Sequence, residues 1–396
     1  MEHRDIVIVG GGMVGSALAA ALAGNGLSIC VLEREAPAPF DPAQDPDLRV
    51  SAISPASARF LAGIGAWDKV LAMRAAPYRR MQVWEGEENR AALFDAAEAD
   101  VEQLGHIVEN RVAQLAATAA LRDKGDVDYR CPAAVSGIVY RPQATQLTLS
   151  DGSQLQARLV VAADGARSLV REAAGIGITG WDYPMHALVL ACRTDGGQQD
   201  ITWQRFTPDG PQAFLPLCGD AASLVWYHRP EEVKRLLALP EAELIAAVAQ
   251  AFPRKLPGIV RIAARGSFPL TRRHAQRYVR DGVALAGDAA HTIHPLAGQG
   301  VNLGFQDAAA LADVILSARG QGEDWAAAAA LARYTRARKP ANLAMQAGMD
   351  AFCYGFSNDI APLRLLRGLG LRLADKAGPL KRGAIRYALG LGPLRR

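Results

Sequence analysis

The sequence has few cysteines, and their arrangement suggests neither a cross-linked protein nor a metal-binding one. Its 396 residues include 5 cysteines, scattered from position 30 to position 353, and no Cys-x-x-Cys pair. An odd number of scattered thiols is typical of a reducing compartment, where cysteines serve mainly as small core residues. We therefore expect no disulfide framework, no catalytic cysteine and, because His291 and His294 have no partner at ligand spacing, no metal site.

Long apolar runs and a strong charge of one sign are also missing. No uninterrupted apolar stretch approaches the ~20 residues that a membrane-spanning helix needs. The first residues lead directly into the strand-like run 6–9, without the charged and apolar regions of a signal peptide. The formal net charge of +4 is too small to predict nucleic-acid binding. These absences predict a cytoplasmic protein without a nucleic-acid partner.

What the sequence does contain is the pattern of a large α/β protein. Half of its residues are hydrophobic and 21% are charged, which excludes a disordered chain. Apolar runs predict buried strands, the segment from about 180 to 270 predicts antiparallel strands, and the last hundred residues are mainly helical. The predicted buried strands are 6–9, 28–32, 159–163 and 283–286; helices are predicted at 13–23, 56–72 and 326–339, and a proline-rich loop at 37–47. We expect a nucleotide-binding α/β domain, interrupted by a mostly β insertion and closed by C-terminal helices.

A glycine-rich turn follows the first strand. Gly10, Gly12 and Gly15 fit the pattern G-x-G-x-x-G, in which the first glycine permits a tight turn, the second lets a pyrophosphate approach and the third lets helix and strand pack closely. Glu33 ends the second strand, where a carboxylate can accept hydrogen bonds from an adenosine ribose. The strand, turn, helix, strand and acid together predict dinucleotide binding.

Two later motifs favour FAD over NAD. Ala163-Asp-Gly-Ala-Arg-Ser-Leu-Val-Arg171 and Leu285-Ala-Gly-Asp-Ala-Ala-His291 each follow a predicted strand, and the Asp of each can bind ribityl hydroxyls or cap the next helix. With the N-terminal glycine turn, these motifs resemble those of the class A flavin monooxygenases. The run from His291 through Gly298-Gln-Gly300 to Asp307 resembles the signature of the ubiquinone-biosynthesis hydroxylases within that class.

The resemblance covers nearly the whole chain and is strongest to the branch that hydroxylates demethoxyubiquinol. One departure is His294, where that branch carries Asn; a histidine fits a sister hydroxylase acting earlier in the pathway. The resemblance implies a Rossmann-like FAD-binding domain with an inserted, mainly antiparallel β substrate domain. The predicted division is 1–76, 108–178 and 273–320 for the FAD-binding domain, 77–107 and 179–272 for the substrate domain, and 321–396 for the C-terminal helical region.

The implied reaction uses NADPH or NADH to reduce the flavin and O₂ to form a flavin C4a-hydroperoxide, which hydroxylates the ring of a polyprenyl benzoquinol, most closely demethoxyubiquinol. Three rivals stay open: another ring position of the same pathway, a soluble phenol as substrate, and a flavin-binding assembly subunit without turnover. A plain NAD dehydrogenase leaves the two downstream motifs unexplained. The ring position, the preferred nicotinamide, the general base and the oligomeric state are not predicted.

The resemblance and the motifs together give a set of candidate site residues. His294 and Pro295 are the predicted catalytic positions, although a structural histidine is equally open at 294. Arg49 is expected to reach the flavin rather than remain a surface charge, and Arg111 and Gln114 are weighed evenly between cofactor contact and ordinary helix surface. The predicted cofactor-binding residues are Gly10, Gly12, Met13, Val14, Gly15, Glu33, Arg34, Arg49, Ser51, Arg111, Asp164, Gly165, Gly287, Asp288, Pro295, Gly298, Gly300, Val301 and Asn302.

Two further features have a structural and a functional interpretation. The aromatic residues of the insertion favour a β-sheet core, and the alternative is an apolar quinol pocket, with Trp203, Phe214 and Trp226 as its candidates. The segment 361–396 carries nine basic residues and one acid among leucines. A solvated helix face is the default interpretation, whereas the functional one is contact with an anionic membrane or with other ubiquinone-biosynthesis proteins; a homo-oligomer is also left open.

Overall fold

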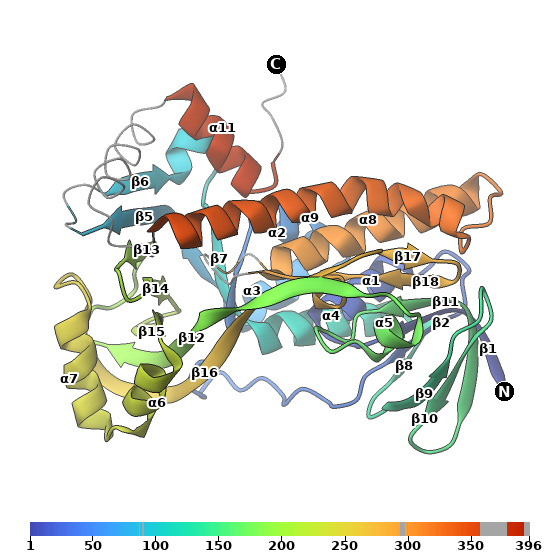
Figure 1. The fold of residues 1–396 in the computed structure, drawn as a ribbon, viewed down its shortest axis with the longest axis horizontal. Helices are drawn as coiled ribbons and strands as arrows, with labels where there is room; N and C mark the ends of the chain where they lie inside the picture. The colour runs from blue at the N-terminus through green and yellow to red at the C-terminus, as the bar shows by residue number, and fades with distance from the viewer. Residues whose placement is uncertain (87, 89–90, 294–297, 299, 357–377, 392–396) are drawn as a thin grey trace.

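The computed structural model describes residues 1–86, 88, 91–293, 298, 300–356 and 378–391. Two large sheets lie toward opposite ends of the molecule. The long strands β12 (Ile178–Thr194) and β16 (Ile259–Ala275) run between them as an antiparallel ribbon (Figure 1). The predicted α/β fold with a mainly antiparallel insertion is confirmed, while the domain boundaries given above stay predictions.

The strands of the first sheet include a parallel set whose central residues are apolar and buried. In spatial order they are β17 (Val279–Arg280), β18 (Val283–Leu285), β11 (Gln154–Ala162), β1 (Glu2–Val9), β2 (Ile29–Leu32) and β8 (Val127–Arg130), with the hairpin strands β9 (Val135–Val139) and β10 (Thr145–Leu149) joined to β11. Strands β1, β2, β11 and β18 coincide with the four apolar runs of the sequence. Because their central residues are buried on both sides, these strands read as continuous hydrophobic runs.

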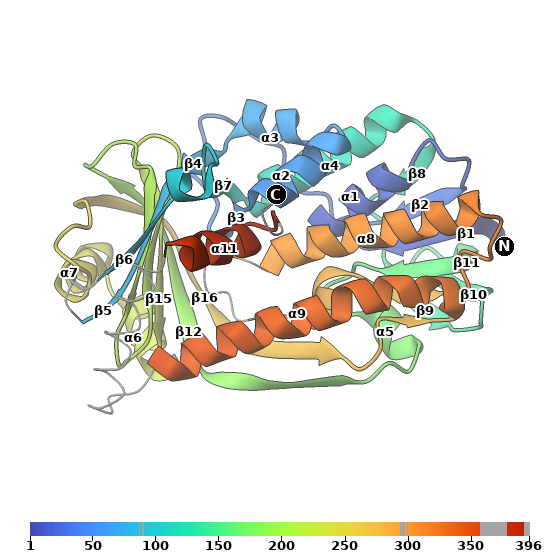
Figure 2. The ribbon, with the colours of Figure 1, turned by 90° about the horizontal axis from the view of Figure 1, so that it is seen from above.

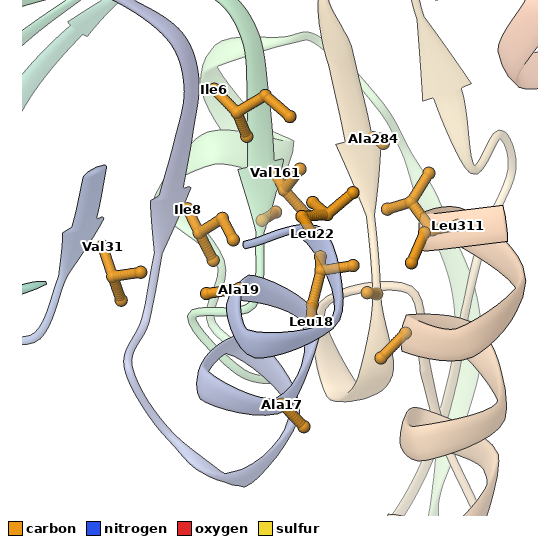
Figure 3. Packing of buried hydrophobic residues seen from close by; sticks show 14 of the residues in the cluster. Ile6, Ile8, Ala17, Leu18, Ala19, Leu22, Val31, Val161, Ala284 and Leu311 are labelled. Atoms are coloured by element: carbon orange, nitrogen blue, oxygen red, sulfur yellow. The ribbon is translucent and has the colours of Figure 1, made fainter. Parts of the chain in front are cut away.

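Helices cover both faces of this sheet. They are α1 (Met13–Leu22), α4 (Asn110–Lys124), α5 (Leu169–Ala173), α8 (Gly300–Gly320) and α9 (Ala328–Phe356), with the 3-10 helix η3 (Gly287–Ala289) directly after β18. Leu18 and Leu22 of α1 lie between the sheet residue Val161 and Leu311 of α8 (Figure 3). Helices α8 and α9 run side by side along the molecule (Figure 2).

The second sheet is antiparallel except where β13 and β5 pair in parallel. In spatial order its strands are β19 (His291–Thr292), β16, β12, β15 (Ala221–His228), β14 (Gln212–Pro216), β13 (Ile201–Phe206), β5 (Arg80–Glu85) and β6 (Ala92–Asp95). Helices α6 (Pro230–Ala238) and α7 (Glu241–Ala251) lie on its outer face, and the rest of the molecule lies on its inner face (Figure 2).

A small sheet and a further helix complete the described chain. The small sheet contains β3 (Val50–Ile53), β7 (Gly105–Glu109) and β4 (Ala76–Tyr78); near it lie the 3-10 helix η2 (Ala96–Ala99) and helix α11 (Pro379–Ala388). The helical stretch predicted at 56–72 consists of two helices, α2 (Pro55–Gly63) and α3 (Trp67–Met73), because Gly65 takes a φ of +80° and ends the first. The helix predicted at 326–339 continues through Pro340 to Phe356. In the described part of the chain, no helix combines the length and the apolarity needed to cross a membrane.

Candidate functional site

The three glycines of the first turn have different structural roles. Gly10 has a φ of +103°, and a Cβ atom placed on it would lie 2.3 Å from the carbonyl oxygen of Ala163. A Cβ on Gly15 would lie 1.9 Å from the carbonyl oxygen of Gly10, so both residues are required by internal packing. A Cβ on Gly12 would meet nothing within 4 Å. The open space over Gly12, at the N-terminus of α1, is therefore where a ligand can approach the backbone.

Glu33 follows β2 and lies beside the same turn. A Cβ on Gly11 would lie 2.8 Å from the Cβ of Glu33 and 3.1 Å from the hydroxyl of Tyr129, which comes from the neighbouring strand β8. Burial raises the pKa of Tyr129 to about 12, so its hydroxyl keeps its proton. The sequence alone does not single out Tyr129, because only the pairing of β2 with β8 brings it to the glycine turn.

Asp164 lies directly after β11, beside the first turn. Its Oδ2 accepts hydrogen bonds from the backbone N–H groups of Leu169 (2.8 Å) and Val170 (3.4 Å), at the start of α5. Its Oδ1 is buried and has no hydrogen-bond partner among the described residues. Burial raises the pKa of this carboxyl. Asp164 thus caps a helix with one oxygen and leaves the other as an acceptor, so the two roles weighed for it are compatible. Gly165 follows with a φ of +83°.

Asp288 and Arg49 lie near one another at the meeting point of the two sheets. Asp288 belongs to η3, and its side chain is exposed although it is closely surrounded by protein. Burial raises its pKa, and the nearby charges of His291 and Arg49 partly oppose that effect. The guanidinium of Arg49 lies 5.5 Å from the ring centroid of Phe268 in β16. Asp288 thus presents a carboxyl at the protein surface, close to the positive charge of Arg49.

A buried acid in α8 holds the turn that carries Asp288. Asp307 accepts from the backbone N–H of Gly287 (3.2 Å), and its other carboxylate oxygen accepts from Arg338 Nε (2.9 Å) and Asn342 Nδ2 (3.1 Å). His291 Nε2 lies 2.5 Å from Asp307 Oδ2. Burial acts to raise the pKa of Asp307, but the charges of His291 and Arg338 outweigh it, and the pKa is lowered.

Sequence reasoning did not single out Asp307 as a functional residue, although one signal for it was available. The position falls on the buried stripe of α8 together with Leu303, Ala308 and Leu311. A carboxylate at a core position of an apolar helix needs a partner, and Arg338 and Asn342 supply it from α9, four residues apart. The identity of those partners depends on how α8 and α9 pack, which the sequence pattern does not contain.

The segment between η3 and α8 is described only in part. His294, Pro295 and Gln299 lie outside the described residues. Gly298 has a φ of +62°, Gly300 begins α8, and Val301 is half-buried. Asn302 is buried: its Nδ2 donates to the carbonyl oxygen of Ala52 (2.7 Å), and its Oδ1 accepts from the backbone N–H of Ser54 (2.9 Å). Asn302 thus fastens the start of α8 to β3.

The remaining candidates make contacts within the protein. Arg111 donates two hydrogen bonds to Asp47 (2.8 and 2.9 Å) and one to the carbonyl oxygen of Pro39 (2.7 Å), so its guanidinium holds the proline-rich loop. Gln114 donates to the carbonyl oxygen of Gly11 (3.3 Å), at the base of the glycine turn. Ser51 donates to Asn110 (2.7 Å). Met13 and Val14 form the half-buried first turn of α1, and Arg34 is exposed beyond β2.

The three candidates for a substrate pocket lie on the outer face of the second sheet. Trp203 stacks on Phe214 with ring centroids 5.7 Å apart, and Trp226 meets Phe252 edge-on at 5.5 Å. All four rings belong to one buried cluster with residues of α6 and α7, such as Leu244. This placement favours the sheet-core interpretation over the pocket. The opposite face of the sheet carries a different cluster: Tyr183, Ala187, Val189, Phe206, Tyr227 and Leu270, with Leu48 and Phe268 against them.

Comparison with known proteins places this arrangement among flavoproteins. The model of a family described as "FAD binding domain" matches residues 3–348. The chain is 50% identical to the 3-demethoxyubiquinol 3-hydroxylase of Escherichia coli strain K12, over 98% of this chain and 99% of that protein. It is 41% identical to the ubiquinone hydroxylase UbiL of Rhodospirillum rubrum, over 98% and 91%. The crystal structure of PqsL of Pseudomonas aeruginosa in complex with 2-aminobenzoylacetate superposes with a TM-score of 0.78, at 25% identity, over 93% of this chain and 99% of that one.

Proposed function

The chain belongs to the FAD-binding-domain family, and on that premise we propose that it hydroxylates the ring of a polyprenylated ubiquinone precursor, most closely demethoxyubiquinol. It is an FAD-dependent monooxygenase that uses NAD(P)H as co-substrate. The observation that carries the proposed substrate is the 50% identity over almost the full length of both chains to a hydroxylase of that ring. The aligned region includes both the turns proposed to bind the cofactor and the second sheet.

The residues present fit the cofactor. Gly12 leaves open space at the N-terminus of α1, where N–H groups and the helix dipole favour a pyrophosphate. Glu33 lies at the end of β2, in reach of a ribose hydroxyl that approaches over the same turn. The buried Oδ1 of Asp164 lacks a hydrogen-bond partner among the described residues, and a hydroxyl group of the cofactor would supply one. We propose Gly12, Glu33, Asp164 and Asp288 as principal contacts of FAD.

Bound FAD supplies the redox chemistry with NAD(P)H and O₂. The protein provides position and electrostatics. Asp307 fixes the turn of Asp288 through the N–H of Gly287, and Arg49 places a positive charge between that turn and Phe268 of the second sheet. An electron-rich quinol ring needs orientation and exclusion of water more than a strong base. The assignment of His294 and Pro295 as catalytic positions, with His294 moving a proton, stays a prediction, since both lie outside the described residues.

The proposed function is tested with the purified chain and with cells that lack it. We expect the protein to retain FAD and to oxidise NAD(P)H faster when a short-chain demethoxyubiquinol is added. Cells without the gene should accumulate the unhydroxylated quinone precursor, and the accumulated compound identifies the ring position. Accumulation of a different precursor assigns the chain to another ring position of the pathway, and an unchanged quinone profile contradicts the proposal.

We further propose that the basic C-terminal segment contacts anionic membrane, where a polyprenyl substrate dissolves. Support comes from α11, where Tyr387 is 62% exposed and Arg382 is also exposed, with its Nη1 3.6 Å from Asp100 Oδ2. Other basic groups of α11 face the protein: Lys381 pairs with Glu98 at 2.8 Å, and Arg386 donates to the carbonyl oxygen of Ala99 (3.4 Å). A surface with an exposed aromatic ring and an exposed cation suits a headgroup region.

Sedimentation with anionic liposomes tests this contact. The variant Arg382→Gln/Tyr387→Ser should bind less than wild type, while Arg336→Gln, which removes an exposed charge from α9, serves as the control. Equal binding of all three proteins would discard the α11 contact. Because Ile385 and Leu389 of α11 are core residues, point variants are preferable to deletion of the segment. A homo-oligomer, which we propose as a separate possibility, is measured on the same samples by light scattering.

A further inference from the structure

The proline-rich loop and the residues that follow it, 37–49, form a strap between the two sheets. Two acids fasten it at different places. Asp45 accepts from Arg261 (2.7 Å to each oxygen) and from Arg193 Nε (3.1 Å), both on the β12–β16 ribbon. Asp47 accepts from Arg111 of α4, and its backbone N–H donates to Glu109 Oε2 (2.7 Å). The strap is therefore tied to the substrate side by Asp45 and to the cofactor side by Asp47.

Leu48 follows these anchors and packs into a notch of β16. A Cβ atom placed on Gly266 would lie 2.6 Å from Leu48 Cδ2, closer than real carbon atoms approach. The notch therefore exists only because residue 266 has no side chain. Leu48 packs there against the inner-face cluster of the second sheet, near Phe268.

Gly266 has no other evident reason to be a glycine. Its φ lies outside the left-handed region, so its backbone suits any residue. Glycine in the interior of a strand weakens the strand, and it commonly marks a place where another group approaches closely. Here the approaching group is Leu48, and the next residue along the chain is Arg49.

We propose that Leu48, seated in the Gly266 notch, is a positioning residue for Arg49. The packing of Leu48 against Gly266 fixes the guanidinium of Arg49 over the ring of Phe268 and beside Asp288. Phe268 lies two residues after Gly266 in β16. Strand β16, on the substrate side, thereby determines where the positive charge of Arg49 lies relative to the turn that carries Asp288. The inference rests on the proposed function for the identity of the cofactor, but the notch is a property of this chain alone.

The variant Gly266→Ala tests the inference. The new methyl group meets only the flexible end of Leu48, so the fold is kept and the strap shifts. Gly137→Ala is the matched control, since a Cβ in that strand lies at an ordinary 3.7 Å from Thr148 Cβ. The double variant Leu48→Val/Gly266→Ala conserves the total side-chain volume. It should therefore restore the packing of residue 48 against residue 266 and the position of the strap.

Three readouts are compared in the FAD-loaded proteins: thermal stability, the visible absorption spectrum of the flavin, and the hydroxylated product formed per NAD(P)H consumed. We expect Gly266→Ala to shift the flavin spectrum and to lower kcat/KM by about tenfold or more, because small misplacements near reacting groups are costly. The double variant should recover most of the loss, and Gly137→Ala should match wild type.

A Gly266→Ala protein that matches wild type in spectrum and kcat/KM overturns the inference. A double variant no better than the single one overturns it too, because the loss then does not arise from the contact between the two residues. Failure of the proposed function is seen separately, as a wild-type protein that binds FAD without forming product. The spectral comparison of variants remains decisive in that case.

Discussion

His291 and Asp307 are joined across the interior of the cofactor-binding region, with His291 Nε2 and Asp307 Oδ2 2.5 Å apart and both side chains buried. Asp307 also accepts from the N–H of Gly287 and from Arg338. One carboxylate thus connects the turn before Asp288 to two helices. Because the group is inaccessible to water, its bonds hold the turn in a single position.

Removing that carboxylate should destabilise the protein strongly. Asp307→Ala leaves Arg338 buried without its partner, and we expect a loss of about 3–5 kcal/mol in the free energy of unfolding. Asp313→Ala, at an exposed position of the same helix, should change it by about 0.5 kcal/mol or less. Urea unfolding of both variants checks this, and equal midpoints would refute the structural role of Asp307.

His274 should make stability depend on pH. Its Nδ1 lies 2.9 Å from Gln346 Oε1, and burial, followed by the charge of His291, lowers its pKa from 6.5 to about 4. Between pH 4 and pH 6.5 the imidazole of His274 is protonated in the unfolded chain but neutral in the folded chain. The contribution of His274 to the free energy of unfolding is therefore complete above pH 6.5. It decreases as the pH falls toward 4, by at most about 1.4 kcal/mol per pH unit.

The variant His274→Gln should lose less stability than wild type between pH 7 and pH 5, because it lacks the titrating group. Chemical unfolding at the two pH values gives the difference, with His3→Gln as the control at an exposed histidine. The same loss in all three proteins would show that His274 does not contribute the slope.

Gly12 and Gly15 of the glycine turn should respond differently to alanine. Gly12→Ala adds a methyl group to open space, so the fold should persist while FAD binding weakens by about tenfold, or ~1.4 kcal/mol. Gly15→Ala forces a methyl group against the carbonyl oxygen of Gly10 and should lower thermal stability first. Flavin titration and melting curves separate the effects; unchanged FAD affinity in Gly12→Ala would argue against the pyrophosphate site.

The two faces of the second sheet give a further contrast. Trp226→Phe, on the face covered by α6 and α7, should cost about 1–3 kcal/mol of stability and leave the KM for the quinol within about twofold. Phe268→Leu, on the inner face, removes the ring beneath Arg49. It should lower kcat/KM by roughly two- to fivefold, the equivalent of a cation–π contact of about 0.5–1 kcal/mol. If Trp226→Phe instead changed the KM for the quinol and Phe268→Leu left kcat/KM unchanged, Trp226 would be assigned to the substrate pocket.

Much of the cofactor-binding fold is predictable because its signals are local. The apolar runs that became β1 and β11 are buried on both sides, and the spacing of Gly10, Gly12 and Gly15 reports a turn made by adjacent residues. The same holds for the hairpin of β10 and β11, where the turn residues Asp151 and Gly152 lie between two short strands.

What the sequence does not determine depends on which surfaces meet. The alternation in β13 places Trp203 and Phe206 on opposite faces, but only the packing of α6 and α7 decides which face is the outer one. Likewise, Arg111 could serve a cofactor or a loop until the position of Asp47 is known. Leu48 has no distinguishing pattern at all, since its role depends on Gly266, more than two hundred residues away.

The most direct test of the account is the source of the oxygen atom in the product. The purified, FAD-loaded chain is supplied with NAD(P)H, a short-chain demethoxyubiquinol and ¹⁸O₂, and the quinone is analysed by mass spectrometry. The account predicts one ¹⁸O atom on the ring for each product molecule. A protein that takes up no FAD, or a product whose added oxygen comes from water, would contradict it.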